Sequence, residues 1–548
     1  MLAPSYLLHA TEPAEEIAEK LHQDILNRII ERILIRFQRG DNYILTAVDK
    51  WQLQTLQEAG FLLEDIQKEI ANSTGYMMDE IKQAMEDAGV RALEYDDAIY
   101  KAAGLDPVPL VQSPYLINLM QRDFEATLGE WKNFTRTTAS AAQQEFISAC
   151  DKAFHLAITG AVDPTQALKE ALEDLIEYGA YVRYDTGHTD TIETATARAV
   201  RTGISQASAH IQLARMDEME VDLVLVSSHM GARPAHQLWQ GKIYSRSGDS
   251  KYPDFVTSTG YGTVTGLCGA NCRHNFGPYF EGMDNPFEQY DSEENRKQYE
   301  LEQRQRTLER RIRETKRKTM NWKNAADKAT DPAQKAKFTA EYERKAALLQ
   351  KQNKAYNDFC ESTGQKKRSE RISIAKWDRS QAAHARAAAK KHYSGWLKSI
   401  GAESTSLNTL DKYLTAKYDE TDEFGILDGY SRAVEKHDIS PLVSLTQYKV
   451  TAAAVDSYIV GEITSTGVQI EGYVSHFIDR VIGQTADSHS GMRRGVPVVD
   501  ALDAILNPIS APKIKTMADG DIRQTFTGQK AIVTISARDK ILIQTNPR

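Results

Sequence analysis

The sequence predicts a multidomain, mainly α-helical protein that contains a small glycine-rich α+β module and ends in an α+β domain. Three observations support this fold class. Apolar residues recur at helical spacing through most of the chain, a glycine-rich segment interrupts them, and period-two alternation appears only near the C-terminus. At 548 residues the chain is also too long for one hydrophobic core. We divide it into residues 1–220, 221–290, 291–400, 401–449 and 450–548.

Bulk composition excludes several classes of protein. Hydrophobic residues make up 41% of the chain, and no apolar run approaches the roughly 18–20 residues that a membrane-spanning helix needs. The N-terminal segment lacks a basic leader before an apolar stretch, so we expect no secretory signal. Four cysteines cannot form a disulfide framework in a chain of this length, which indicates synthesis and assembly in a reducing cytoplasm.

The net charge of −9 hides a strong partition. Residues 1–190 hold 16 Lys and Arg against 32 Asp and Glu, a balance of −16. Residues 291–400 hold 28 against 15, a balance of +13. Such a chain has one surface that repels nucleic acid and another that attracts it, or two surfaces that attract each other.

Residues 1–220 are predicted to be almost entirely helical. Isoleucine and leucine recur at intervals of four in residues 14–36, which is the pattern of an amphipathic helix. Asp163 before Pro164 is a helix start signal, because the carboxylate caps the helix and proline suits its first turn. Further helices are expected at residues 50–72, 77–101, 114–158, 164–180 and 191–219.

Residues 221–290 change character. A β-branched run at 221–228 predicts a buried strand, and a second short strand is expected around 242–244. Trp239 is expected to anchor a small core, with Pro234 fixing a turn before it. A catalytic role for His236 is the alternative, but no nucleophile with its own base accompanies it in the sequence.

Two cysteines and a histidine form a metal-like pattern in this module. Cys268, Cys272 and His274 are ligand types that zinc prefers, and His229 or His236 would complete a tetrahedral set. The spacers, however, differ from the common two-residue knuckle. The alternative is that the cysteines are small buried residues beside glycine turns. We therefore expect this module to fold without an essential metal, and we expect no cofactor for the chain.

Residues 291–400 are highly charged and break at 330–332, which predicts two long helices in an antiparallel pair. Their basic runs are candidates for phosphate contacts with DNA. A solvated face and contact with the acidic N-terminal region of a neighbouring copy are the alternatives. Residues 401–449 are expected to be a linker with short helices.

Residues 450–548 are predicted to form two helices, at 473–484 and 496–506, followed by a four-stranded antiparallel meander. The strands are expected at residues 513–517, 522–528, 531–537 and 541–545, with turns at 519–520, 528–529 and 539–540. Alternation turns side chains such as Phe526 and Val533 towards the helices. The opposite face would display cations and hydroxyl groups, namely Lys513, Lys515, Arg523, Thr525, Thr527, Thr534 and Ser536.

The glycine-rich segment resembles a known family. SSHMGARPAHQLWQGKIYS, followed by TGYGTVTGLCGANCRHNFGPYFEG, is similar to the Mu-F-type head-morphogenesis domain of minor capsid proteins in tailed bacteriophages, specifically the phage minor capsid protein 2 group. The resemblance implies a virion protein inside the capsid, assembled in the host cytoplasm, with the portal protein and capsid components as partners. Packaged DNA would then be the nucleic acid that residues 291–400 contact.

The layout of residues 450–548 resembles the barnase/colicin/RelE-like ribonuclease fold, which proteins of this group can carry as a C-terminal toxin domain. The resemblance implies metal-independent cleavage of RNA. One group activates the 2′-hydroxyl, another protonates the leaving oxygen, and a cation stabilises the charge that develops between them. The implied catalytic residues are His476, Arg480, Arg523 and Thr534, and the implied RNA-binding residues are Lys513, Lys515, Thr525 and Thr527.

His476 is the leading acid/base candidate, with His489 in reserve. His476 and Arg480 are i,i+4 neighbours on the side of their helix opposite its apolar stripe, so they would be solvated unless that helix borders the cleft. An ordinary surface pair is the alternative. Two other functions remain open for the chain: a ribonuclease toxin on a phage-derived delivery scaffold, and a purely structural capsid protein with an inert C-terminal domain.

Overall fold

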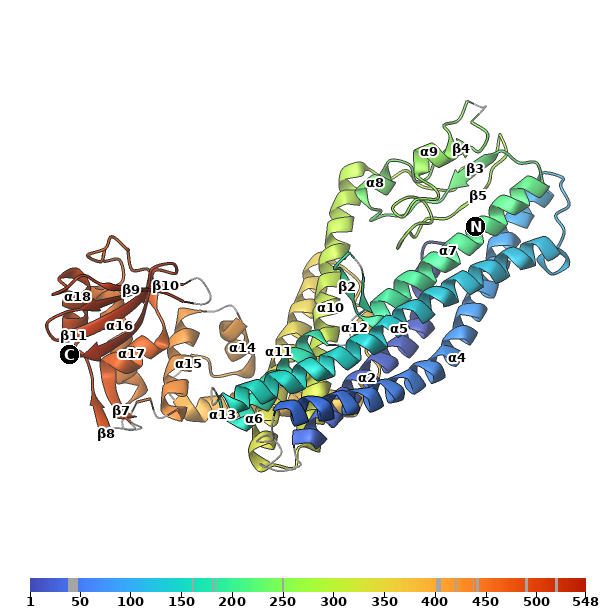
Figure 1. Cartoon of the computed structure of the whole chain (residues 1–548). Coiled ribbons are helices and arrows are strands. Elements are labelled where there is room, and N and C mark those ends of the chain that lie inside the picture. Colours follow the sequence, from blue (N-terminus) through green and yellow to red (C-terminus); the bar gives the residue numbers. More distant parts are fainter. Residues whose placement is uncertain are drawn as a thin grey trace. The chain divides into compact units, whose positions relative to one another are not determined.

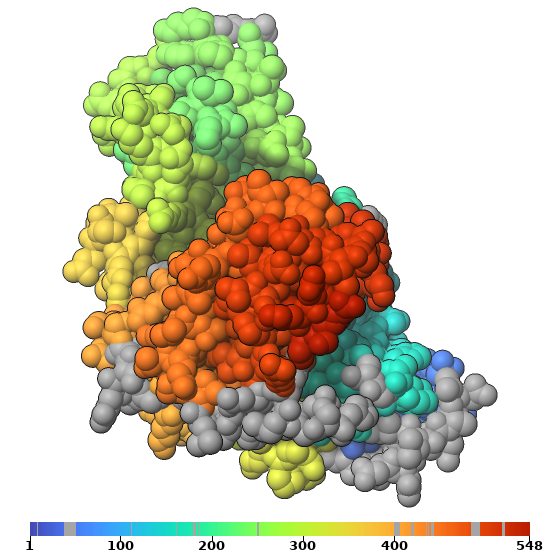
Figure 2. All heavy atoms as spheres, turned by 90° about the vertical axis from the view of Figure 1, so that its left-hand side faces the viewer, coloured from blue at the N-terminus to red at the C-terminus, as the bar shows by residue number. Residues whose placement is uncertain are grey.

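The structure, a computed structural model, consists of two compact units, residues 1–385 and residues 386–548 (Figure 1). It describes the whole chain except residues 38–47, 160–161, 180–181, 185, 249–250, 401–405, 419–420, 437, 440–442, 488–490 and 518–520. In the space-filling view the described residues of the second unit pack into one rounded body, coloured orange to red (Figure 2). The predicted fold class, a multidomain and mainly helical protein with a C-terminal α+β part, is confirmed.

Long helices form a bundle in the first unit. They are α1 (Tyr6–His9), α2 (Glu12–Phe37), α4 (Val48–Ala102), the short 3-10 helix η1 (Leu110–Gln112), α5 (Pro114–Ile158), α6 (Pro164–Tyr178) and α7 (Ile192–Glu218). Helix α5 packs against α4, α6 and α7, while α2 packs against α4 and α7. Their apolar stripes meet in one core around the buried side chains of Trp51, Trp131 and Phe146. Asp163 caps α6 as predicted, by accepting a hydrogen bond from the backbone N–H of Gln166.

Helix α4 is a single helix of 55 residues, where the sequence predicted two helices, at 50–72 and 77–101. The polar segment around Gly75 had indicated a break. The helix continues because Met77 and Ile81 carry the buried stripe onward. A glycine inside a helix costs only about 1 kcal/mol relative to alanine, which the packing of a long helix offsets.

A small antiparallel hairpin precedes α7 and was not predicted. It pairs β1 (Val182–Arg183) with β2 (Thr189–Asp190). Strands of two residues are too short for alternation to be recognised in a sequence. The side chain of Asp190 ties the hairpin to α7 by accepting a hydrogen bond from Arg198.

The glycine-rich module, residues 221–290, is built on a three-stranded antiparallel sheet in the order β4–β3–β5. Its elements are β3 (Leu223–Val226), α8 (Pro234–Gln237), β4 (Ile243–Ser245), α9 (Phe255–Thr259) and β5 (Phe276–Pro278). Trp239 lies in the core as predicted, together with Tyr100 of α4 and Met216 of α7. Gly266 is required by a close turn, since a β-carbon there would lie 1.9 Å from the carbonyl oxygen of Gly260. The module therefore shares its core with the bundle.

Helices α10 (Ser292–Lys328) and α11 (Pro332–Thr363) form the predicted antiparallel pair, called the basic hairpin below (Figure 1). Asp331, within the predicted break at 330–332, caps α11. The hairpin is followed by α12 (Ser369–Ile372). Because α10 packs against α2 and α6, and Trp322 and Phe338 join the core of the bundle, the hairpin is an integral layer of the first unit.

The second unit combines helices with a five-stranded sheet in the order β6–β12–β11–β10–β9. The helices are α13 (Arg379–Ile400), which begins shortly before this unit, α14 (Leu410–Tyr418), α15 (Asp422–Glu435), α16 (Leu445–Tyr458), α17 (Ser475–Ile482) and α18 (Val498–Leu506). The strands are β6 (Gly472–Tyr473), β7 (Gly483–Asp487), β8 (Gly491–Arg494), β9 (Lys513–Thr516), β10 (Ile522–Thr527), β11 (Ala531–Ser536) and β12 (Ile541–Pro547).

The predicted antiparallel meander of β9 to β12 is confirmed. Two features were not predicted: β6 pairs parallel to β12, and β7 pairs with β8 in a separate hairpin. The predicted helix at 473–484 ends at Ile482, because Gly483 has a φ of +73° that leaves the helical region. The predicted turn at 519–520 lies outside the described residues. No helix among the described residues has the length and apolar character needed to cross a membrane.

Candidate functional site

The face of the C-terminal sheet that carries the predicted site is built by cross-strand register. Arg523 on β10 pairs with Lys515 on one side, and Thr525 pairs with Lys513 in the same way. On the other side of β10, Thr525 lies opposite Thr534, and their hydroxyl oxygens are 3.1 Å apart. Paired residues point to the same face of a sheet, so these side chains are neighbours, as the alternation predicts.

The hydroxyl groups of β11 are less accessible than predicted. Thr534 is 8% exposed and Ser536 is fully buried. Ser536 donates a 2.6 Å hydrogen bond to the buried carboxylate of Asp521, and Nε of Arg523 lies 3.3 Å from the same carboxylate. A central strand is shielded by the longer side chains of its neighbours, which alternation alone does not reveal. The solvent-facing part of this sheet face therefore consists mainly of the cations on β9 and β10.

Two helices pack on the other face of the sheet, and a third packs against them. Helix α17 packs on β12, α18 packs on β10 and β11, and α16 touches both helices, so the three form one layer. Beneath it lie the buried side chains of Phe526, Val533, Ile535 and Leu542. A β-carbon at Gly528, two residues after Phe526 and so on the same face of the strand, would lie 2.7 Å from Ala504 of α18. The apolar residues of the strands therefore face the helices, as predicted.

His476 and Arg480 lie in that helix layer, on α17. Nε of Arg480 donates to Nε2 of His476 at 3.0 Å, and the carboxylates of Asp438 and Asp479 lie close to the same histidine. Burial, helped by the charge of Arg480, lowers the pKa of His476. Burial raises the pKa of Asp479 to about 7, although the hydroxyl of Tyr448 donates a hydrogen bond to it.

The structure thus divides the residues that the ribonuclease resemblance combines. Arg523 and Thr534 belong to the sheet face, whereas His476 and Arg480 belong to the helix layer over the opposite face. His489 lies outside the described residues. Asp521, which the sequence analysis did not single out, orients Arg523; its only signal was its position two residues before that arginine. The sheet face has cations that can bind a phosphodiester, but its strands contain no histidine that could act as an acid or a base.

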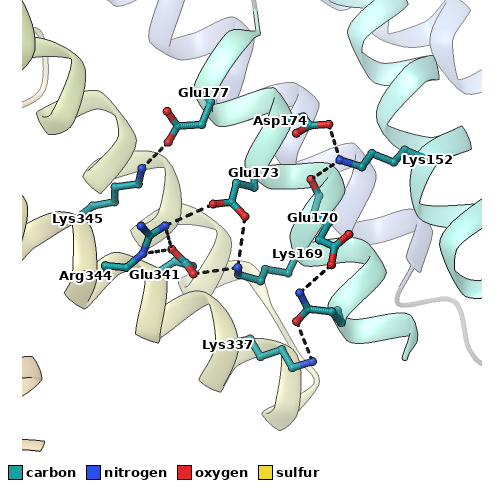
Figure 3. A network of polar contacts seen from close by, with 11 residues as sticks. Lys152, Lys169, Glu170, Glu173, Asp174, Glu177, Lys337, Glu341, Arg344 and Lys345 are labelled. Carbon is teal, nitrogen blue, oxygen red and sulfur yellow. Dashed lines mark hydrogen bonds and ion pairs between the residues drawn. The ribbon is translucent and has the colours of Figure 1, made fainter. Parts of the chain in front are cut away.

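The basic hairpin directs much of its charge into its own chain, as Figure 3 shows for α6 and α11. Nζ of Lys169 on α6 lies 3.0 Å from Glu341 on α11 and 3.3 Å from Glu173. Arg344 of α11 pairs with Glu341 and, at 3.4 Å, with Glu173. Cations and anions alternate across this contact, so each helix supplies charge that the other lacks.

Pairs of the same kind join α10 to the bundle. Glu177 of α6 accepts hydrogen bonds from both Lys318 and Lys345. Burial opposes the charge of Glu177, but these two lysines outweigh it and lower the pKa of the carboxyl. Arg317 pairs in the same way with the buried Glu193 of α7. The opposite charges of residues 1–190 and 291–400 therefore attract each other within one chain.

The predicted metal candidates lie together in the interior of the glycine-rich module. Cys268, Cys272 and His274 are each 1–2% exposed, and His236 of α8 reaches the same place with 3% exposure. The ring of Trp239 lies against both histidines, with centroids 4.5 Å from His236 and 4.8 Å from His274. Burial lowers the pKa of both histidines and raises that of both thiols.

Helix α4 carries a surface that the sequence analysis did not single out. The helix exposes large apolar side chains at positions along its length, with 70% exposure at Tyr76 and 59% at Leu53. These side chains are Leu53, Leu56, Phe61, Tyr76, Met78, Val90 and Tyr95. Phe61 and Ile35 also line a groove of about 560 Å³ between α2 and α4. Scattered exposed apolar residues are ordinary, but a concentration on one helix is typical of an interaction surface.

Comparison with known proteins relates the chain to phage capsids. The family model described as phage minor capsid protein 2 matches residues 2–361, which cover the bundle, the glycine-rich module and the basic hairpin. A curated protein, described as a structural protein of Lactococcus phage LL-H, is 23% identical over 295 residues, or 51% of this chain and 80% of that relative. No solved structure matches the chain.

Proposed function

We propose, since this chain belongs to the phage minor capsid protein 2 family and so has a structural role in the phage capsid, that its helical unit docks on the portal or inner shell through helix α4. The placement that follows is inside the virion head, after assembly in the host cytoplasm. The portal protein and other capsid components would be the partners.

The exposed apolar side chains of α4 are the observation that carries this proposal. Leu53 and Leu56 are i,i+3 neighbours, so they present one continuous patch, with 59% and 58% exposure. Burying a leucine side chain contributes about 1.5–3 kcal/mol. A long helix with exposed apolar side chains at intervals is suited to an extended contact with another protein, because that contact would remove these side chains from water.

The charge of α4 specifies what the partner surface should be. The helix holds 12 Asp and Glu against 5 Lys and Arg. DNA would be repelled by this balance, whereas a basic protein surface with apolar pockets would be attracted. The acidic residues that neutralise the basic hairpin come from other helices, including Glu177 on α6 and Glu193 on α7.

A co-purification experiment with the full-length chain tests the docking. Procapsids assembled with the double variant Leu53→Ser/Leu56→Ser should retain at least tenfold less protein than procapsids with the wild type, because two buried leucines contribute about 3 kcal/mol. Val450→Ser, at a residue that is 64% exposed outside α4, is the matched control and should be retained normally. Equal retention of the double variant and the wild type would contradict the proposal.

Ion pairs within the chain engage many of the basic residues of 291–400, so fewer of them are left to contact packaged DNA. We propose that this contact involves exposed basic residues such as Arg310 and Arg311 on α10. Replacing both by glutamine should weaken DNA binding by the full-length protein and flatten its dependence on salt. Unchanged binding would assign the basic hairpin to internal pairing alone.

Recognition of RNA by the sheet face of residues 450–548 is a second candidate function, favoured by the row of Lys515 and Arg523 beside Lys513 and Thr525. A surface with several cations suits the phosphates of a single strand. A metal-independent endoribonuclease would be the enzymatic form of this function. It would need an acid and a base from outside the strands, because His476 lies over the other face of the sheet.

Incubation of the full-length protein with labelled RNA separates the alternatives. Cleavage that persists in EDTA and is lost in Arg523→Ala would support the ribonuclease, since a single charge-stabilising group contributes about 10²–10³ in rate. Arg538→Ala, at an exposed arginine that pairs with its neighbour Asp539, is the control. Binding without cleavage would indicate an RNA-binding capsid protein. The absence of both binding and cleavage would indicate an inert C-terminal domain.

A further inference from the structure

We propose that His236, Cys272 and His274 form a binding site for a tetrahedral transition-metal ion of the zinc type. The three side chains come from α8 and from the loop before β5, and their ligand atoms all lie within 4.8 Å of one another. The irregular spacing of Cys268, Cys272 and His274 had favoured a module without an essential metal. The structure selects His236, 36 positions away from Cys272, as the ligand that spacing alone does not identify.

The distances between the three ligand atoms match a tetrahedron around a single ion. Nδ1 of His236 lies 3.4 Å from Nδ1 of His274, and Sγ of Cys272 lies 3.9 Å and 3.7 Å from these two nitrogens. Metal bonds of about 2.0 Å to nitrogen and about 2.3 Å to sulfur place tetrahedral nitrogens about 3.3 Å apart, and nitrogen and sulfur about 3.5 Å apart. An ion therefore fits with adjustments of roughly 0.1–0.4 Å.

Hydrogen bonds on the far side of each ring determine which nitrogen faces the cluster. Nε2 of His236 lies 2.9 Å from the backbone carbonyl oxygen of Thr265, which can only accept, so this nitrogen carries the hydrogen. Nε2 of His274 lies 2.9 Å from the side-chain oxygen of Gln240. When the rings are neutral, both Nδ1 atoms therefore carry a lone pair and no hydrogen.

The orientation of Gln240 is itself fixed, so the assignment at His274 does not depend on a choice of amide flip. Its side-chain oxygen accepts the backbone N–H of His229 at 3.1 Å, and its amide nitrogen donates to the side-chain oxygen of Gln237. The oxygen, not the amide nitrogen, therefore faces His274. A histidine whose second ring N–H is held by an oxygen acceptor is the usual support of a metal ligand.

Two facing lone pairs leave the buried cluster electrostatically incomplete. The Nδ1 atoms of His236 and His274 repel each other at 3.4 Å, and the single thiol hydrogen of Cys272 can satisfy one of them at most. A divalent cation removes this conflict, because it attracts both lone pairs and binds the sulfur as a thiolate. Water would take the fourth position, since Cys268 does not belong to the group of ligand atoms that lie within 4.8 Å of one another.

The site would be structural, since its three ligands are 1–3% exposed. It would join α8 to the loop before β5. The ion would thus stabilise the folded module by cross-linking two segments that are distant in the sequence.

Metal analysis of the full-length protein tests the proposal. After purification without chelators, the wild type should contain about one zinc per chain. His236→Gln and Cys272→Ser should each lower that content at least tenfold, and Cys360→Ser, another buried cysteine outside the module, should leave it unchanged. Chelation should lower the melting temperature of the wild type, and added zinc should restore it.

A spectroscopic measurement on the wild type keeps the test decisive if the ligand variants do not fold. Cobalt bound in place of zinc should give the intense visible absorption of a tetrahedral site and a thiolate-to-metal charge-transfer band. Wild-type protein that binds neither zinc nor cobalt after exposure to excess metal would overturn the proposal. Full metal content in a folded His236→Gln or Cys272→Ser variant would overturn it equally.

Discussion

The basic hairpin and the C-terminal sheet face look alike in the sequence, because both are rich in cations, but the structure gives their charges different surroundings. Lys318 and Lys345 of the hairpin share Glu177, with side chains 20% and 9% exposed. Lys513 and Lys515 on β9 are exposed. A run of basic residues therefore indicates a surface for nucleic acid only where the chain does not itself supply the opposite charge.

The largest effect is expected from removing Glu177, the carboxylate of α6 that two lysines of the basic hairpin share. Glu177→Gln should lower the free energy of unfolding by about 2 kcal/mol, because it leaves two partly buried lysines without their charge partner. Chemical denaturation at neutral pH measures the difference. Since the pKa of Glu177 is lowered in the folded protein, the advantage of the wild type is present above the ordinary pKa and should disappear as the pH falls below it.

A matched control is available on the same hairpin. Glu300 pairs with Arg296 at i,i+4 spacing, and both side chains are more than half exposed. Glu300→Gln should change the free energy of unfolding by less than about 0.5 kcal/mol. Equal effects of Glu177→Gln and Glu300→Gln would show that internal pairing does not hold the hairpin on the bundle.

The buried carboxyl of the helix layer offers a second test, of similar or smaller size. The pKa of Asp479 is raised by burial from 3.8 to about 7, so the folded protein holds a proton that the unfolded chain releases. Stability from this group is present below the ordinary value and is lost as the pH rises through 7. Asp479→Asn should therefore stabilise the second unit by about 2 kcal/mol at pH 8, with little gain at pH 4. A gain independent of pH would contradict the assignment.

The smallest effect on folding and the sharpest on binding are expected at the sheet face. Lys513→Ala/Lys515→Ala should leave the free energy of unfolding within about 0.5 kcal/mol of the wild type. If this face binds RNA, the slope of the logarithm of affinity against the logarithm of salt concentration should fall by about 1.4, which corresponds to two phosphate contacts. Lys318→Ala should leave that slope unchanged, since the lysine is engaged by Glu177.

Sequence patterns predicted most of the secondary structure because the signals were local. The cap at Asp163, the break before Pro332 and the alternation in β10 and β11 depend on neighbouring residues only, and each is present in the structure. The continuity of α4 was missed because a local polar segment is overridden by packing along its whole length.

The candidate sites were less predictable because they depend on contacts between distant residues. The place of His236 beside Cys272 depends on how the module folds over its sheet, and the separation of His476 from Arg523 depends on which face of the sheet α17 covers. The opposite charges of the two regions were visible in the sequence. That they meet within one chain was not, since a neighbouring copy would have satisfied the same pattern.

Cross-linking followed by mass spectrometry of assembled procapsids tests the docking of α4 most directly. Lys68 and Lys82 lie on α4, and their side chains are 74% and 61% exposed, so both are accessible to an amine-reactive reagent. The docking proposal predicts cross-links from one or both of these lysines to the portal or the inner shell protein. Cross-links to those partners that arise only from residues 386–548 would contradict it.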